Sequence, residues 1–585
     1  MWRSMRSASA LGLAGLMAAS APPAALAAPP AVRDGRPTPA ACEALGFPTV
    51  GGAASSVTVS ASRSFGRGAA TPAIPPLPVP PVARRSEEPR MAPPPPPPAP
   101  TVVVGAPRPP MDTERYPNAQ ANPIKRVAEE PVSTFSVDVD TASYANVRRF
   151  LNDGVQPPAD AVRVEELINY FDYGYARPGD RSRPFEAYVA VAPSPWSKDR
   201  QIVHIGLQGY DLPRTAQPPL NLVFLVDTSG SMWGEDRLPL ATKALNLLVD
   251  QLRPQDRVAI VAYAGSAGAV LAPTDGRSKL KVRCALESLR AGGSTAGGRG
   301  IALAYELAKQ NFDPKAVNRV ILLTDGDFNV GVADPARLKD MVAEQRKSGV
   351  YLSVYGFGRG NYKDDMMQAL AQNGNGTAAY VDTLNEARKL FREDFSSSLF
   401  PIADDVKIQV EFNPATVTEY RLIGYETRML AREDFNNDQV DAGEVGANAS
   451  VTALYEITPA GAPGSSDPLR YGNAAPPASG ASRELAYLKV RYKLPGQPNS
   501  HLIERPIGAR DVYASIQSAP EATRWAVSVA AFGQMLKRDP RLDAGFGWPQ
   551  VIDLAQGARG NDPFGLRAEF VQLVRAAGEA SPKGD

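Results

Sequence analysis

Apolar runs alternate with amphipathic stretches between residues 219 and 400. The runs at 222–226 and 320–323 contain only apolar side chains, which is typical of parallel strands buried on both faces. Between them, leucine or alanine at positions 238, 241, 245, 248 and 252 has the spacing of a helix with one buried side. Strands that alternate with helices predict an α/β fold with a doubly wound, mostly parallel sheet.

The remaining elements of this region follow the same alternation. Further strands are predicted at residues 258–263, 269–271, 351–357 and 377–381, the second of them at an edge, and helices at 278–290, 300–310, 335–348, 363–373 and 384–395. Sheets of this kind bind ligands beyond the carboxyl ends of their strands. We therefore expect functional residues directly after positions 226 and 324.

The regions on either side show a different pattern. After position 400, alternating apolar and polar residues predict strands at 406–412, 417–422, 451–457 and 485–492, followed by helices at 521–538, 548–555 and 565–577. Before position 219, strands are predicted at 133–139, 185–191 and 201–207, with helices at 142–153 and 161–171. We expect a small β-sandwich built from both regions (117–218 and 401–585), with the α/β domain (219–400) inserted between them.

The N-terminal region predicts export. Arg3 and Arg6 precede an apolar stretch that ends in Ala25-Leu26-Ala27, the pattern of a signal peptide over residues 1–27. Residues 28–116 are rich in proline and predict a disordered spacer. No lipid-attachment motif and no later membrane-spanning segment is recognised, so we expect the periplasm, cell envelope or cell surface of a bacterium.

Charge and rare residues narrow the class of function. The 585 residues carry a net charge of +1 without a basic cluster interleaved with aromatics, which disfavours nucleic acid as a partner. His204 and His501 lack the neighbours of a metal-binding or catalytic histidine, so each is expected to be packed or solvated. Cys42 and Cys284 are the only cysteines, and the sequence leaves open whether they form a disulfide or two thiols.

Side chains with oxygen atoms follow two of the predicted strands. Asp227, Ser229 and Ser231 alternate along the chain and so can converge on one side. Thr295 follows a glycine-rich stretch, and Asp325 follows the run at 320–324. A set made only of carboxylate and hydroxyl oxygens suits a hard cation such as Mg²⁺, with Mn²⁺ or Ca²⁺ as alternatives.

This constellation resembles the metal-ion-dependent adhesion site of von Willebrand factor type A domains. The resemblance implies that Ser229, Ser231 and Thr295 are close ligands and that Asp227 and Asp325 act directly or through water. It also implies that an Asp or Glu of a partner protein completes the coordination of the ion. From about residue 118 onward, and most clearly at residues 421–426, the chain is similar to bacterial exported type A proteins, although it lacks the lipid-attachment motif of many of them.

Two further sets of residues are candidates for binding. Trp233, Gly293 and Asp327 are expected on the partner-binding face, with packing of Trp233 over the first helix as the alternative. Asp434, Asn436 and Asp438 match the first ligand positions of a Ca²⁺ loop. Gln439 and Val445 stand where that loop needs glycine and glutamate, so a solvated acidic hairpin loop is the default prediction.

The sequence thus favours a metal-dependent protein-binding module that is not an enzyme. One alternative is a metal-dependent hydrolase or phosphotransferase that uses Asp227 as nucleophile, with Lys243 and Arg299 in the neighbourhood. That alternative lacks a glycine-rich phosphate loop. The other alternative is an envelope scaffold whose metal site is structural or non-functional.

Overall fold

The computed structural model describes residues 32–33, 36–47, 114–116, 120–179, 181–295, 297–326, 335–360, 362–465 and 484–581. The predicted signal peptide and the polyproline run lie outside these residues. Within them, no helix combines the length and the apolar character needed to cross a membrane.

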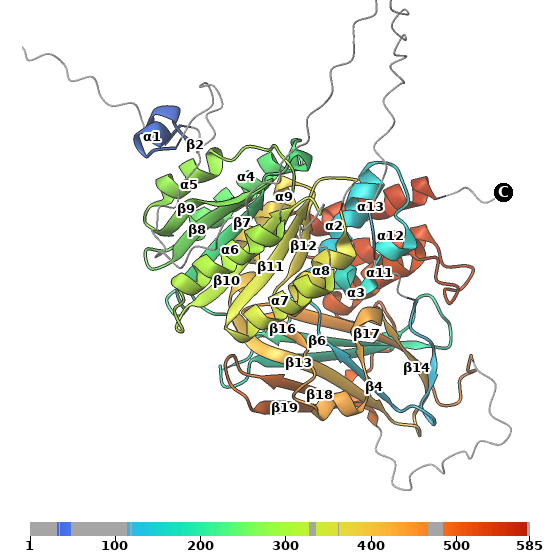
Figure 1. Ribbon diagram of the computed structural model, residues 1–585. Helices are drawn as coiled ribbons and strands as arrows, with labels where there is room; N and C mark the ends of the chain where they lie inside the picture. Colours follow the sequence, from blue (N-terminus) through green and yellow to red (C-terminus); the bar gives the residue numbers. More distant parts are fainter. Residues whose placement is uncertain are drawn as a thin grey trace, which may run out of the picture.

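The α/β domain contains one six-stranded sheet (Figure 1). Its strand order is β12-β11-β10-β7-β8-β9, and only β9 at the edge is antiparallel to its neighbour. The predicted doubly wound, mostly parallel sheet is confirmed. The strands are β7 (Leu220–Asp227), β8 (Arg257–Tyr263), β9 (Ala267–Asp275), β10 (Val317–Thr324), β11 (Val350–Phe357) and β12 (Ala378–Val381).

Helices cover both faces of this sheet because alternate residues of its strands point to opposite sides. Phe224 packs in one core with the helices on the first face, and Val223 packs in another core with those on the second. The first face carries α4 (Leu238–Gln251), α5 (Lys279–Glu287), α9 (Leu384–Arg388) and α10 (Phe395–Leu399); the second carries α6 (Gly297–Gln310), α7 (Pro335–Lys347) and α8 (Asp364–Asn373).

Two further sheets form the predicted sandwich from segments on both sides of the α/β domain. One has the order β15-β4-β13-β18-β19 with β16 also on β13, and the other has the order β3-β14-β17-β6-β5. The α/β domain lies between these segments in the chain, and β4 pairs with β13 and β6 with β17 across it. The strands are β3 (Lys125–Arg126), β4 (Val132–Ser136), β5 (Phe185–Pro193), β6 (Gln201–Gly209), β13 (Pro401–Phe412), β14 (Val417–Ile423), β15 (Met429–Leu430), β16 (Gly443–Gly446), β17 (Ser450–Pro459), β18 (Glu484–Lys493) and β19 (Ser500–Gly508).

Helices from both ends of the chain pack into one cluster beside the sandwich (Figure 1). Its centre is the fully buried ring of Trp525, which contacts Phe171 and Phe570 edge to face. The helices are α2 (Ala142–Asn152), α3 (Val164–Asn169), α11 (Glu521–Leu536), α12 (Trp548–Gly557) and α13 (Leu566–Ala580).

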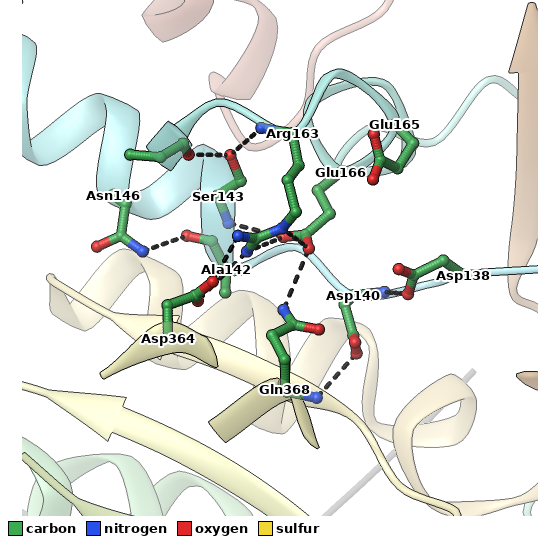
Figure 2. Close-up of polar contacts among 12 residues, drawn as sticks. Asp138, Asp140, Ala142, Ser143, Asn146, Arg163, Glu165, Glu166, Asp364 and Gln368 are labelled. Carbon is green, nitrogen blue, oxygen red and sulfur yellow. Dashed lines mark hydrogen bonds and ion pairs between the residues drawn. The ribbon is translucent and has the colours of Figure 1, made fainter. Parts of the chain in front are cut away.

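Buried ion pairs join this helical cluster to the α/β domain. Arg163, just before α3, binds Glu166 and also Asp364 at the start of α8 (Figure 2). Arg148 on α2 binds Glu386 of α9 at 2.8 Å. Arginine forks that reach carboxylates on other parts of the fold fix how these parts sit together.

The expectation of disorder is wrong for part of the proline-rich segment. Residues 36–47 include β2 (Arg36–Pro37) and a short helix, α1 (Pro39–Ala44), and residues 114–116 lie along the loop before α8. Helix α1 is held against the α/β domain by a covalent bond, since Cys42 forms a disulfide with Cys284 on α5. The disulfide also answers the question that the sequence left open.

Candidate metal site

The two aspartates follow neighbouring strands at the carboxyl edge of the sheet. Val226 pairs with Leu323 in the parallel register of β7 and β10, so Asp227 and Thr324 come next to each other, and Asp325 follows. Asp227 is fully buried and Asp325 is 1% exposed. Strand register therefore brings together two carboxylates that lie 98 positions apart in the chain.

The loop after β7 folds so that its two serines meet. The backbone N–H of Ser229 donates to Oδ1 of Asp227 at 2.9 Å, which turns the chain back toward the strand end. The hydroxyl oxygens of Ser229 and Ser231 then lie 2.8 Å apart. Adjacent ligands of an octahedral Mg²⁺ at ~2.1 Å lie about 3 Å apart, so this spacing fits two neighbouring positions around one ion.

Thr295 lies in a loop that is tied to the first one by its backbone. The N–H of Gly230 donates to the carbonyl of Gly293 at 2.9 Å, and the N–H of Gly292 donates to the carbonyl of Thr228 at 2.8 Å. Gly293 has a φ of +83°, a conformation that favours glycine. The structure thus joins the loops of Ser229, Ser231 and Thr295 at the same edge of the sheet.

Three residues that sequence reasoning missed support the aspartates. The hydroxyls of Tyr263 and Thr324 each donate to Oδ2 of Asp227 at 3.1 Å. Arg237 places its guanidinium 3.6 Å from Oδ2 of Asp325 and donates to the carbonyl of Ser231. These contacts depend on the packing of segments that are separate in the chain, so no local sequence motif predicts them.

Electrostatics at this edge favour a cation. The pKa of the Asp227 carboxyl is raised to about 6, because burial and, to a smaller extent, the charge of Asp325 outweigh the hydrogen bonds from Ser229 that lower it. Two buried carboxylates and several hydroxyls make a donor set of hard oxygens. The residues present therefore fit Mg²⁺ or a similar divalent ion.

Comparison with known proteins agrees with this geometry. Residues 221–393 match the family model for the von Willebrand factor type A domain, residues 110–204 match one described as von Willebrand factor, and residues 397–580 match one described as Uncharacterized protein YfbK, C-terminal. The chain is 46% identical to YfbK of Escherichia coli K12 over 472 residues, 80% of this chain and 81% of YfbK. The chain belongs to the YfbK family of von Willebrand factor type A proteins.

Other similarities concern parts of the chain. The Synechocystis protein sll0103 is 32% identical over 177 residues, 30% of this chain and 41% of that protein. Human inter-alpha-trypsin inhibitor heavy chain H4 is 26% identical over 227 residues, 36% of this chain and 24% of that protein. Among solved structures, a von Willebrand factor type A protein from Catenulispora acidiphila is 18% identical with a TM-score of 0.40, over 67% of this chain and 89% of that one.

The face around the candidate metal site includes an exposed aromatic ring. Trp233 is 80% exposed, which rules out the alternative that it packs over the first helix. Gly293 is also exposed, whereas Asp327 lies outside the described residues.

The loop considered for Ca²⁺ is engaged with cations of the protein. The ammonium of Lys407 donates to the backbone carbonyl oxygens of Asp434 and Asn437 at 3.0 and 2.6 Å. Asp438 accepts from Arg491 at 3.0 Å. In the part of the chain that the structure describes, no group of three or more His, Cys, Asp or Glu side chains is arranged to hold a metal ion.

The two histidines are placed as expected. His204 is fully buried between Tyr175 and Thr523, whose hydroxyl oxygens lie 2.6 and 2.9 Å from its ring nitrogens. Burial lowers the pKa of His204 to about 3, so the imidazole is neutral. His501 is exposed and stacks on Tyr492.

Proposed function

We propose that the protein is an exported, metal-dependent protein-binding module. Ser229, Ser231 and Thr295 would hold a Mg²⁺ ion, with Asp227 and Asp325 acting directly or through water. The observation that carries the proposal is the buried Asp227 beside two serine hydroxyls 2.8 Å apart, at the carboxyl edge of a type A sheet.

A bound Mg²⁺ would supply an electrophilic centre with room for one oxygen of a partner's Asp or Glu. The residues of the chain would keep the ion electrophilic and hold its carboxylate ligand in place. Serine and threonine contribute neutral oxygens and so leave the ion with most of its charge. The hydrogen bonds from Tyr263 and Thr324 hold the Asp227 carboxylate in one orientation before the ion arrives.

The hydrolase and phosphotransferase alternative is not adopted. Both oxygens of the Asp227 carboxylate accept hydrogen bonds, from Ser229 on one side and from Tyr263 and Thr324 on the other. Each of these hydrogen bonds withdraws electron density from the carboxylate and makes it a weaker nucleophile. The scaffold alternative becomes an outcome of the following experiment.

The test is an affinity capture from bacterial envelope extract with protein that starts at Ala28. Baits are the wild type in Mg²⁺, the wild type in EDTA, and the Asp227→Ala and Ser231→Ala variants in Mg²⁺. Asp250→Ala is the matched control, since Asp250 is 54% exposed and pairs with Arg283 on the surface. We expect a partner that the wild type and the control retain in Mg²⁺ and that the other baits lose.

Ser231→Ala controls for loss of folding in Asp227→Ala, because it removes one half-buried hydroxyl and leaves the buried Asp227 in place. A set of captured proteins that neither EDTA nor either site variant changes would contradict the proposal and support a structural role for the site.

A further inference from the structure

We propose that a groove next to the metal site binds the segment of the partner that follows its metal-binding carboxylate. This segment would carry a bulky apolar side chain and then a second carboxylate. The inference rests on the proposed function and specifies the class of partner. The groove, called the side groove below, has a volume of about 420 Å³ and is lined by residues that include Arg36, Met232, Trp233, Leu238, Lys243 and Leu289.

The side groove begins beside the metal site and has an apolar floor. Trp233 follows Ser231 by two positions, and its 80% exposed ring forms one wall. Met232, Leu238 and Leu289 line the groove and are 0%, 5% and 7% exposed. An exposed aromatic ring above an apolar floor is a surface that a bulky apolar side chain would cover.

The polar lining of the side groove contains cations that have no carboxylate partner among the described residues. Lys243 is half-buried, Arg36 is exposed, and neither makes an ion pair or side-chain hydrogen bond with a described residue. Arg290 instead donates to two backbone carbonyls of its own loop. Glu235 and Glu287 also line the groove, and three basic against two acidic side chains leave an excess of one positive charge.

Lys243 favours a negatively charged group of the partner in the side groove. A half-buried ammonium on an apolar floor loses hydration without gaining a partner, so a carboxylate that reaches it would be more strongly attracted than at an open surface. The metal site and Lys243 would thus bind two carboxylates of one segment, with the apolar side chain over the floor between them.

The disulfide holds one side of the side groove in place. Arg36 lies on β2, and α1 follows directly with Cys42, which is bonded to Cys284 on α5 (Figure 1). The two cysteines are 3% and 1% exposed. This link joins positions 242 residues apart, so the contribution of Arg36 to the groove depends on the disulfide rather than on the local chain.

The test uses the protein from Ala28 to its C-terminus and a phage-displayed peptide library with one fixed Asp flanked by random positions. With the wild type in Mg²⁺, we expect enrichment of an apolar residue and then an acidic residue after the fixed Asp. Trp233→Ala is expected to lose the apolar preference, and Lys243→Glu the acidic one. A peptide synthesised from the enriched sequence should bind at least tenfold more weakly to each variant.

The controls separate this inference from the proposed function. Lys309→Glu changes an exposed lysine at the far end of α6 and should leave the selection unchanged. The double variant Cys42→Ser, Cys284→Ser should keep Mg²⁺ binding but weaken the acidic preference. Enrichment that depends on Mg²⁺ and Asp227, yet shows no preference after the fixed Asp, would overturn the side groove alone. Selection that is indifferent to EDTA and to Asp227→Ala would overturn the proposed function.

Discussion

Glu165 is a buried carboxyl group without a hydrogen-bond partner among the described residues. It is 1% exposed, and neither of its side-chain oxygens accepts a hydrogen bond. In Figure 2 no dashed line reaches its carboxyl group, in contrast to that of the neighbouring Glu166. Burial, together with the charges of Glu426 and Glu166, raises the pKa of Glu165 to about 8.

The pKa of Glu165 predicts that stability depends on pH. Between about pH 4.5 and pH 8 the folded protein keeps a proton that the unfolded chain has released, so the free energy of unfolding should fall as pH rises through this window. Glu165→Gln mimics the protonated form and should flatten this slope, with the largest gain in stability above pH 8. Urea unfolding at pH 5, 7 and 8.5 measures the effect.

Glu579→Gln is the matched control, because Glu579 is exposed on the C-terminal helix α13. It should leave the pH profile of the wild type unchanged. Equal slopes for the wild type and Glu165→Gln would show that Glu165 is ionised in the fold or that another group dominates.

At the scale of single elements, α6 packs against a residue of the candidate metal site through a glycine. A Cβ on Gly300 would lie 2.9 Å from three atoms of the Tyr263 side chain, so helix and ring approach as closely as they do only because the Cβ is missing. The hydroxyl of the same Tyr263 donates to Asp227. The position of α6 is thereby coupled to the orientation of a carboxylate at the metal site.

Gly300→Ala is therefore predicted to weaken metal binding without changing any ligand. Overpacking should cost about 1–3 kcal/mol of stability and displace either α6 or the Tyr263 ring. The increase in melting temperature that saturating Mg²⁺ produces should be smaller than in the wild type. Gly268→Ala on β9 is the control, since a Cβ there has no atom within 4 Å. An unchanged Mg²⁺ response in a destabilised Gly300→Ala protein would refute the coupling.

How far the sequence predicts an element depends on where its stabilisation comes from. Buried strands such as β7 and β10 can be predicted from the sequence because both of their faces are apolar. Asp227 and Asp325 are then recognisable as the residues at which these apolar runs end. Strand β19 was missed because it lies at a sheet edge, where the exposed neighbours His501 and Leu502 break the alternation of apolar and polar positions. Helix α1 was missed because its tie to the fold is a disulfide to a distant residue.

The same reasoning applies to the site. The five expected ligand positions are local motifs, but the support from Arg237, Tyr263 and Thr324 arises only from the register and packing of the folded chain.

At the scale of the whole molecule, the type A domain is an insertion whose two ends meet. A Cβ on Gly209, at the end of β6, would lie 2.8 Å from the side chain of Ile402 near the start of β13. The two sheets of the sandwich pair strands from before and after the insertion, so they require both flanks and no strand of the α/β sheet. Ion pairs of Arg148 and Arg163 cross between the two units.

This arrangement predicts that the flanking unit folds without the type A domain. Replacing residues 212–399 with a short Gly-Ser linker should leave a protein that unfolds cooperatively and keeps the circular dichroism of its sheets and helices. In a chain that ends at residue 400 the flanking segment should fail to fold, because β4 and β6 would lose β13 and β17. A deletion variant without cooperative unfolding would show that the two units stabilise each other.

Substitution of Arg148 tests this prediction a second time, because its effect on stability should differ between the full chain and the deletion variant. In the full chain Arg148 is 1% exposed and binds Asp382 and Glu386 of the type A domain. Arg148→Met would leave those carboxylates buried without compensation, at a cost of about 3–5 kcal/mol. In the deletion variant both carboxylates are absent, and only the partly exposed Glu569 of α13, 3.2 Å away, still pairs with Arg148. The same substitution should therefore cost much less than in the full chain. Urea unfolding of the four proteins measures the difference, and an equal loss in both backgrounds would place the contribution of Arg148 within the helical cluster instead of at the junction.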